Sequence, residues 1–249
     1  MAHIHPTALV DPQAELHESV EVGPFCAVGP DVVIGAGSRL ISHVVLGGPT
    51  VIGARNTIYP FSSVGLAPQD KKYAGEPTRL EIGDDNVIRE NVTLHRGTAG
   101  GTGVTRIGSR TLIMAYAHVA HDCVVEDDVI MANAATLAGH VSVGRFAILG
   151  GLTGVHQFTR IGAHAMVGGG SIVLQDVAPY VIGHGNPFSV SGINLEGLRR
   201  RGFSRAAIQA IRDAYRTVFR ASLTLKDALA QLESSAAAAE SSEEVRMAL

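Results

Sequence analysis

Three of the eleven histidines in this 249-residue chain, His121, His140 and His156, follow aliphatic residues that recur every eighteen positions. His118 stands just ahead of them in the sequence. Imidazole titrates near neutral pH, so these side chains are suited to removing a proton from a substrate hydroxyl. A lone histidine is usually structural, but four along one edge of a repeating fold would span only about 10 Å. We therefore interpret them as a candidate general-base cluster.

Two residues beside these histidines fit the same chemistry. Asp122 directly follows His121, and a carboxylate there would fix the tautomer of the ring. Neighbouring residues of a strand face opposite ways, so the sequence leaves their contact open. Gly139 precedes His140 and can expose a backbone N–H to a developing oxyanion.

The element that must position these residues is a six-residue repeat. Every sixth residue is aliphatic from Ile4 to Val64, from Ile82 to Leu94 and from Ile107 to Val173. Of these 26 positions, 25 are Ile, Leu or Val and one is Met. With 46% hydrophobic residues in the chain, chance agreement is on the order of 10⁻⁹.

The period of six excludes a plain helix, which needs 3.6, and a plain strand, which needs two. A small or short residue usually stands four places after each aliphatic residue, and glycine often follows it directly, as at Gly23, Gly29 and Gly35. We predict a solenoid in which each hexad is a short strand and a corner. The aliphatic side chain points inward, and the glycine supplies the turn.

Two interruptions divide the repeat. The first, at residues 68–80, is polar and bounded by prolines, whereas the second, at residues 97–105, is rich in glycine but matches no phosphate-loop spacing. We predict that both are loops ejected from the solenoid, that the first carries function, and that the second is a flexible flap.

The hexads stop near Pro187, and the tail at residues 188–249 has helical periodicity. Ser204 is placed to cap one helix, and Thr224 with Asp227 resembles a capping box before another, with fraying expected after Ser234. The cluster Arg199–Arg201 near its start has two readings: a solvated basic face, or a dock for an acidic partner or a phosphate.

Composition limits the classes of function. The net charge of −3 and pI near 6.4 do not indicate nucleic-acid binding. We see no signal peptide and no integral membrane segment, and Cys26 and Cys123 make no disulfide framework. Both cysteines fall on the small inward position, where packing is their expected role. A cytoplasmic protein is the resulting expectation.

Six strings carry a family resemblance that covers nearly the whole chain: SHVVLGG, QDKKYAGEPTRLEIGDDNVIRENVTLHRGT, AHVAHDC, ATLAGHVSVG, VHQFTRIGAHAMVGG and NLEGLRRRGFSR. They resemble the UDP-N-acetylglucosamine 3-O-acyltransferases of lipid A biosynthesis, a hexapeptide-repeat transferase family. The resemblance implies a mainly β fold, a left-handed parallel β-helix over residues 1–187 with a small α-helical domain over residues 188–249. It also implies a homotrimer with active sites between subunits.

The implied reaction moves an (R)-3-hydroxyacyl chain from acyl carrier protein to the 3-hydroxyl of UDP-N-acetylglucosamine, the first step of lipid A biosynthesis. The acyl chain arrives on the phosphopantetheine of the carrier, and the enzyme itself holds no cofactor and no metal. The resemblance makes His121 the general base and Gly139 the oxyanion donor, and we predict Asp122, as the carboxylate beside the base, to be the third catalytic residue. It assigns the remaining site positions to substrate binding: Asp70, Lys72, His95, His118, His140, His156, Gln157, Gly169, Asn194, Glu196 and Arg200.

The resemblance makes these substrate roles specific in part. Asp70 and Lys72 would contact the sugar and the acyl hydroxyl region, and Gly169 would limit the acyl length. Asn194, Glu196 and Arg200 would lie near the nucleotide, while the other positions would line the cleft. The basic tail would meet acidic acyl carrier protein.

Three rival interpretations remain at this stage. The sister N-acyltransferase of the same pathway carries an extra N-terminal domain, whereas these hexads begin at Ile4. A zinc-dependent hydratase of the trimeric β-helix type would use His118, His121 and His140 as ligands, but its paired HxxxxH motif is missing. A purely structural β-helix would not need the QDKKY loop or the clustered histidines.

Overall fold

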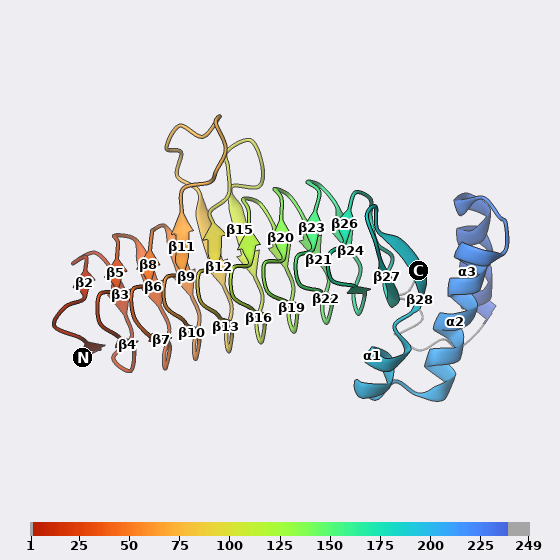
Figure 1. The fold of residues 1–249 in the computed structure, drawn as a ribbon, viewed down its shortest axis with the longest axis horizontal. Helices are drawn as coiled ribbons and strands as arrows, with labels where there is room; N and C mark the ends of the chain where they lie inside the picture. The colour runs from red at the N-terminus through yellow and green to blue at the C-terminus, as the bar shows by residue number, and fades with distance from the viewer. Residues whose placement is uncertain (1, 239–249) are drawn as a thin grey trace.

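The computed structural model describes residues 2–238, which form a three-sided prism of parallel strands with helices at its C-terminal end (Figure 1). From β1 to β26, consecutive strands belong in turn to sheet A, sheet B and sheet C, so three strands complete one coil. This arrangement is the left-handed parallel β-helix that the family resemblance predicts. We call the turns that lead from a sheet B strand to the next sheet C strand the B–C corner.

Sheet A contains β1 (His3–Ile4), β4 (Glu21–Val22), β7 (Arg39–Leu40), β10 (Thr57–Ile58), β13 (Val87–Ile88), β16 (Leu112–Ile113), β19 (Ile130–Met131), β22 (Ile148–Leu149), β25 (Met166–Val167), β27 (Val181–His184) and β28 (Ser189–Ile193). Sheet B contains β2 (Leu9–Val10), β5 (Ala27–Val28), β8 (Val45–Leu46), β11 (Ser63–Leu66), β14 (Thr93–His95), β17 (His118–Val119), β20 (Thr136–Leu137), β23 (Gly154–Val155) and β26 (Ile172–Val173). Sheet C contains β3 (Glu15–Leu16), β6 (Val32–Ile34), β9 (Thr50–Ile52), β12 (Arg79–Ile82), β15 (Val104–Ile107), β18 (Val124–Val125), β21 (Ser142–Val143) and β24 (Arg160–Ile161).

The aliphatic hexad residues build the core of the prism. From Val22 onward they are buried, and each pairs with its counterpart on the next coil, as Val119 does with Leu137. The first coil is the exception: Ile4 is 46% exposed, and Val10 and Leu16 are only partly buried, because β1, β2 and β3 are the first strands of their sheets and each has one neighbour. The predicted inward face is therefore confirmed except at the N-terminal coil.

The corners do not turn in the way that the glycine pattern predicts. Most residues with a left-handed backbone are the fourth of their hexad, as at Phe25 and Asp31. The glycines directly after the aliphatic residue have an ordinary backbone, except Gly65 at the start of the first insert, with φ of 75°. A Cβ on Gly23 would instead collide with the carbonyl of Ile41 on the next coil. Glycine is thus required there by close approach of two coils rather than by the turn itself.

Both interruptions leave the prism at the B–C corner, where they form the loops above β11 and β15 (Figure 1). The first joins β11 to β12, and the second joins β14 to β15. Because β12 begins at Arg79 and β15 at Val104, each predicted insert extends two residues into a strand. Pairing resumes on both sides of the inserts, since Thr57 pairs with Val87 and Val87 with Leu112.

The C-terminal helices are α1 (Leu195–Arg200), α2 (Arg205–Arg220) and α3 (Leu225–Ala238). Ser204 caps α2 by accepting from the Ala207 N–H at 3.1 Å, and Thr224 accepts from the Asp227 N–H at 3.2 Å, as predicted. Strand β28 pairs with β27, so sheet A continues to Ile193, past the boundary predicted at residue 187. Helix α3 continues beyond Ser234 to Ala238, and the rest of the predicted frayed segment lies outside the described residues.

In residues 2–238 no helix combines the length and apolarity needed to cross a membrane.

An aromatic stack joins this helical part to the prism. The His164 ring stacks on Phe146 at 4.8 Å and on Tyr180 at 5.3 Å, and Phe203 packs edge-on at 5.1 Å. His164 is 4% exposed, and burial, together with nearby Arg201 and Arg145, lowers its pKa to about 4. The imidazole is therefore neutral at neutral pH and acts as a packing ring.

Because the pKa of His164 lies below its ordinary value, the unfolded chain takes up a proton first as the pH falls. The contribution of neutral His164 to the free energy of unfolding is fully present above pH 6.5. Up to about 3 kcal/mol of this contribution is lost as the pH falls toward 4. We predict that His164→Phe will reduce the loss of melting temperature between pH 7.5 and pH 4.5. Thermal unfolding at both pH values measures this, with exposed His17→Gln as the control. An acid loss as large in His164→Phe as in the wild type would contradict the prediction.

Candidate active site

The candidate site is built on the B–C corner of three successive coils. His121 lies between β17 and β18, Gly139 and His140 between β20 and β21, and His156 between β23 and β24. The turns are bonded to one another, because the His140 N–H donates to the His121 carbonyl at 3.0 Å. The register therefore brings the histidines to one edge, as the repeat predicts.

His121 contacts Asp122 directly, which answers the question that the sequence left open. The two atoms, His121 Nδ1 and Asp122 Oδ2, are 2.9 Å apart. The rule that neighbouring residues face opposite ways does not apply, because both lie in the turn after β17 and Asp122 has a left-handed backbone, with φ of 58°. The carboxylate accepts from Nδ1–H and leaves Nε2 of His121 with its lone pair.

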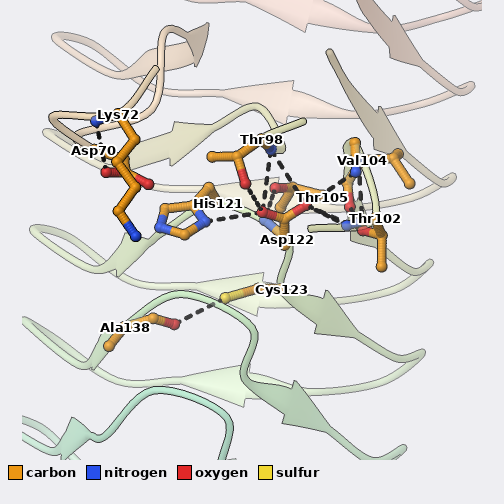
Figure 2. A network of polar contacts seen from close by, with 11 residues as sticks. Asp70, Lys72, Thr98, Thr102, Val104, Thr105, His121, Asp122, Cys123 and Ala138 are labelled. Carbon is orange, nitrogen blue, oxygen red and sulfur yellow. Dashed lines mark hydrogen bonds and ion pairs between the residues drawn. The ribbon is translucent and has the colours of Figure 1, made fainter. Parts of the chain in front are cut away.

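Asp122 is a buried anion held by the second insert (Figure 2). Its side chain is 0% exposed. It accepts from Thr98 Oγ1 at 2.7 Å and from the backbone N–H groups of Thr98, Thr102 and Gly103 at 2.9–3.2 Å. Burial acts to raise the pKa of Asp122, but the hydrogen bonds from Thr98, His121 and Thr102 outweigh it, so the pKa is lowered.

The second insert is therefore not the flexible flap that its glycines predict. Residues 97–103 fold onto a carboxylate of the chain itself, with Thr98 buried at 6% exposure. The backbone N–H groups of a glycine-rich loop form the same kind of anion nest that binds phosphate in other proteins. The glycine-rich composition is thus typical of an anion-binding loop, but the anion that this loop binds is the Asp122 carboxylate of the same chain.

Gly139 lies against the face of the His121 ring. A Cβ at this position would be 2.5 Å from His121 Cε1 and 2.7 Å from Nε2, so only glycine leaves the ring in place. In the part of the chain that the structure describes, no acceptor takes the Gly139 N–H. The same place in other turns is held by prolines, at Pro24 and Pro60, which shows that the coil does not use this N–H.

The rings of the corner contact one another. His121 meets His140 edge-on at 5.0 Å, and His140 stacks on Phe158 at 4.5 Å with an interplanar angle of 8°. Phe158 was missed by the sequence reasoning, although it occupies the fourth hexad position directly after His156 and Gln157. His156 is exposed, with Nδ1 3.1 Å from the Gln157 carbonyl.

His118 lies in β17 itself and not at the corner where the repeat placed it. Its side chain faces outward from sheet B, and Nδ1 is 2.6 Å from Thr93 Oγ1. Burial, and then neighbouring His95, lowers the pKa of His118 to about 4. The His95 ring is 5.3 Å away, with Nδ1 2.6 Å from the Ala67 carbonyl and Nε2 buried without a partner among the described residues.

The first insert brings two more predicted residues to this corner. Asp70 Oδ1 accepts from the Lys72 N–H at 3.0 Å, and the Lys72 side chain extends toward the His121 ring (Figure 2). Arg96 donates to the Tyr73 hydroxyl at 3.0 Å, and this hydroxyl donates to the Glu76 carbonyl at 2.9 Å. Arg96 and Tyr73, which the sequence did not single out, thus hold the shape of the insert.

Four predicted residues lie elsewhere in the chain. Gly169 is in the turn after β25, between sheets A and B. Asn194 caps α1 and donates to the His164 carbonyl at 2.9 Å. Glu196 and Arg200 form an exposed ion pair at 2.9 Å on the same helix. A single chain therefore does not bring these positions to His121.

The donor set does not suit a metal ion. His121, Asp122 and His140 have ligand atoms within 4.8 Å of one another. The oxygens of Asp122, however, are already occupied by N–H and O–H donors of the second insert. Burial also raises the pKa of the Cys123 thiol to about 12, so this neighbour is a packing residue.

Comparison with known proteins identifies the family. The family model described as UDP N-acetylglucosamine O-acyltransferase, domain 2, matches residues 176–249, and the bacterial transferase hexapeptide model matches residues 105–139. The structure of LpxA from Acinetobacter baumannii is 50% identical, with a TM-score of 0.91 over 93% of this chain and 90% of that one. This chain belongs to the UDP-N-acetylglucosamine O-acyltransferases.

Two further UDP-N-acetylglucosamine acyltransferase structures show the breadth of the similarity. The enzyme from Moraxella catarrhalis is 48% identical, with a TM-score of 0.95 over 98% of this chain and 94% of that one. The Arabidopsis enzyme is 37% identical, with a TM-score of 0.80 over 93% and 89%. Membership of this acyltransferase family decides against the N-acyltransferase, the hydratase and the purely structural reading.

The contact between Gly139 and His121 generates a prediction. Gly139→Ala should displace the ring and lower the kcat of acyl transfer by about 100-fold, the cost of roughly 1 Å of misplacement. Gly151→Ala is the matched control, because Gly151 has the same place in its turn and a Cβ there meets only the Asn133 carbonyl, at 3.2 Å. Steady-state kinetics with circular dichroism compares the two variants. Equal activity in both would show that the glycine is not needed for the ring.

Proposed function

We propose that this acyltransferase moves an (R)-3-hydroxyacyl group from acyl carrier protein to the 3-hydroxyl of UDP-N-acetylglucosamine, the first step of lipid A biosynthesis. The observation that carries the proposal is the His121–Asp122 pair packed against Gly139, whose N–H has no acceptor among the described residues, within a member of this family. A hydroxyl nucleophile needs a base, and a thioester carbonyl needs an oxyanion donor. The corner supplies both within a few ångströms.

In the proposed mechanism, Nε2 of His121 accepts the proton of the sugar 3-hydroxyl as that oxygen attacks the thioester carbonyl. Asp122 holds Nδ1–H and stabilises the imidazolium that forms. The Gly139 N–H donates to the tetrahedral oxyanion, a contribution of about 3–4 kcal/mol in comparable sites. The intermediate collapses to the new ester and expels the phosphopantetheine thiolate, which takes the proton from His121.

The substrate-binding roles follow from position. Asp70 and Lys72 on the first insert would contact the sugar and the acyl hydroxyl region, since the insert stands beside His121. His140, His156 and Gln157 at the B–C corner, together with His95 and His118 on sheet B, would line the cleft. The low pKa of His118 supports a neutral, hydrogen-bonding role.

We infer a homotrimer with active sites between subunits. Gly169, Asn194, Glu196 and Arg200 lie away from the His121 corner of their own chain, so one site would take them from a neighbour. The outer face of sheet A supports this assembly, because it carries a stripe of partly exposed apolar residues: Leu112, Ile130, Ile148 and Met166. Tyr116 and Leu152, beside this stripe, are 66% and 72% exposed.

The remaining partners are proposed from charge and compartment. The exposed arginines of α1 would meet the acidic acyl carrier protein, which delivers the acyl chain on its phosphopantetheine. The prism of roughly residues 1–187 would hold the chemistry, and the following helical part would bind nucleotide and carrier. Since the carrier and the nucleotide sugar are soluble, we place the reaction in the cytoplasm.

Removing the proposed base gives the direct test. His121→Ala should keep the fold and the oligomeric state and lower kcat by about 10²- to 10⁴-fold, the usual contribution of a general base. The assay combines UDP-N-acetylglucosamine with a panel of hydroxyacyl carrier proteins and identifies products by mass. The control is His17→Ala, at the far end of the prism. Substantial transfer by His121→Ala would refute its role as the base.

The position of Gly169 predicts a change in specificity. A Cβ at Gly169 has its nearest contact with the Gly151 carbonyl at 3.2 Å, so the turn accepts a side chain with a small adjustment. Gly169→Met should therefore fold and shorten the preferred acyl chain, because the added side chain occupies the end of the acyl channel. Competition between carriers with chains of different length measures the preference, and an unchanged profile would contradict the proposed ruler.

A further inference from the structure

The second insert contacts the same oxygen of Asp122 that His121 contacts. Thr98 Oγ1 donates to Oδ2 at 2.7 Å, and His121 Nδ1 contacts the same oxygen at 2.9 Å. The hydroxyl of Thr102 is shared, since its distance to the Val104 carbonyl is 2.9 Å and to Asp122 Oδ1 is 3.1 Å. Thr98 is thus the side chain that competes with the imidazole for one carboxylate oxygen.

Two glycines of the insert, Gly101 and Gly103, are explained by the same carboxylate. A Cβ on Gly101 would collide with Asp122 Cγ, and a Cβ on Gly97 would collide with the backbone of Val104. Gly103 has a φ of 73° and donates its N–H to Asp122 Oδ1 at 3.1 Å. The loop is therefore shaped around this acid at Gly101 and Gly103, whereas Gly97 is required by the close approach of the loop's own backbone.

We propose that Thr98 is a positioning residue, which holds the Asp122 carboxylate in one orientation, shares its charge, and so keeps His121 with Nδ1–H bonded and Nε2 free. This inference rests on the proposed function, because it assigns a role to Thr98 in the reaction at His121. Thr98 does not touch the substrate. It acts through two side chains that do the chemistry or support it.

The physical argument concerns the oxygen that Thr98 and His121 share. When the Thr98 hydroxyl is removed, more of the charge on Oδ2 is available to the imidazolium, which is then harder to deprotonate. Within residues 2–238, the other charged or titratable groups that face His121 are His140, at 5.0 Å between rings, and Lys72 on the first insert. Neither contacts Asp122, so the effect of Thr98 is separable from theirs.

The test compares three substitutions. Thr98→Val removes the donor and keeps the shape, and Thr98→Ser restores the donor. The matched control is Thr111→Val, because Thr111 is also buried and its Oγ1 donates to Asn86 Oδ1 at the same 2.7 Å, away from the site. Each variant is assayed for kcat, for KM of UDP-N-acetylglucosamine and for kcat/KM against pH.

We expect Thr98→Val to lower kcat about tenfold with KM within about twofold, and to move the acidic decline of kcat/KM to higher pH. Thr98→Ser should recover both, and Thr111→Val should lose stability without either change. A wild-type profile in Thr98→Val would overturn the proposal. The proposal would also be overturned if Thr98→Val and Thr111→Val both lowered kcat without moving the pH profile, because Thr98 would then have only a structural role.

A second measurement separates this proposal from the proposed reaction. The Nδ1–H proton of His121, observed by NMR of the histidine-labelled trimer or monomer, should shift in Thr98→Val and stay in place in Thr111→Val. If the wild type transfers no acyl group, the proposed function fails while this readout still tests Thr98. If Thr98→Val does not fold, Thr98→Ala removes the same donor without placing a methyl group against the carboxylate.

Discussion

The spacing between coils is the constraint on which the rest of the structure depends. Parallel strands are hydrogen-bonded about 4.8 Å apart, so each corner residue has its counterpart at that height on the next coil. Aromatic rings fit this spacing, since Phe25, His43 and Phe61 lie at 5.0 Å with their planes tilted, and His140 stacks on Phe158 at 4.5 Å. His121 stands one position earlier in its turn, over Gly139, and its ring meets His140 edge-on rather than in a stack.

The same constraint explains why the site needs residues from outside the repeat. Within the prism, most backbone N–H groups of the strands are committed to carbonyls of the next coil. A carboxylate buried at the corner, such as Asp122, therefore finds few donors in the regular hexads. Burying an unpaired charge is costly, so the donors must come from an added segment. The second insert supplies them from Thr98, Thr102 and Gly103, which links an interruption of the period to one acidic side chain.

The sequence could predict those features of the fold and of the site that follow from the six-residue repeat. The hexad register placed Val119, Leu137 and Val155 on one sheet, and through them His121 and His140 on one corner, because positions along a solenoid follow from counting. It misplaced His118 by one position, since the boundary between strand and turn is not part of the period. The contact between His121 and Asp122 depends on a left-handed backbone at Asp122, and glycines in residues 97–103 do not reveal that their partner is internal.

The charged and neutral groups around His121 suit a residue that becomes protonated during the reaction. A general base must be neutral before the reaction and cationic after it accepts the proton. Its surroundings should therefore stabilise the imidazolium, but not so strongly that the imidazole is already protonated before the substrate reacts. Asp122 provides the stabilising charge, and its donors prevent it from taking the proton itself. His118 on the same coil has a pKa lowered to about 4, so it stays neutral and does not oppose the imidazolium at His121. A protonated histidine at that place would repel the imidazolium that forms at His121. Burial of His118 thus serves the same end as the loop around Asp122.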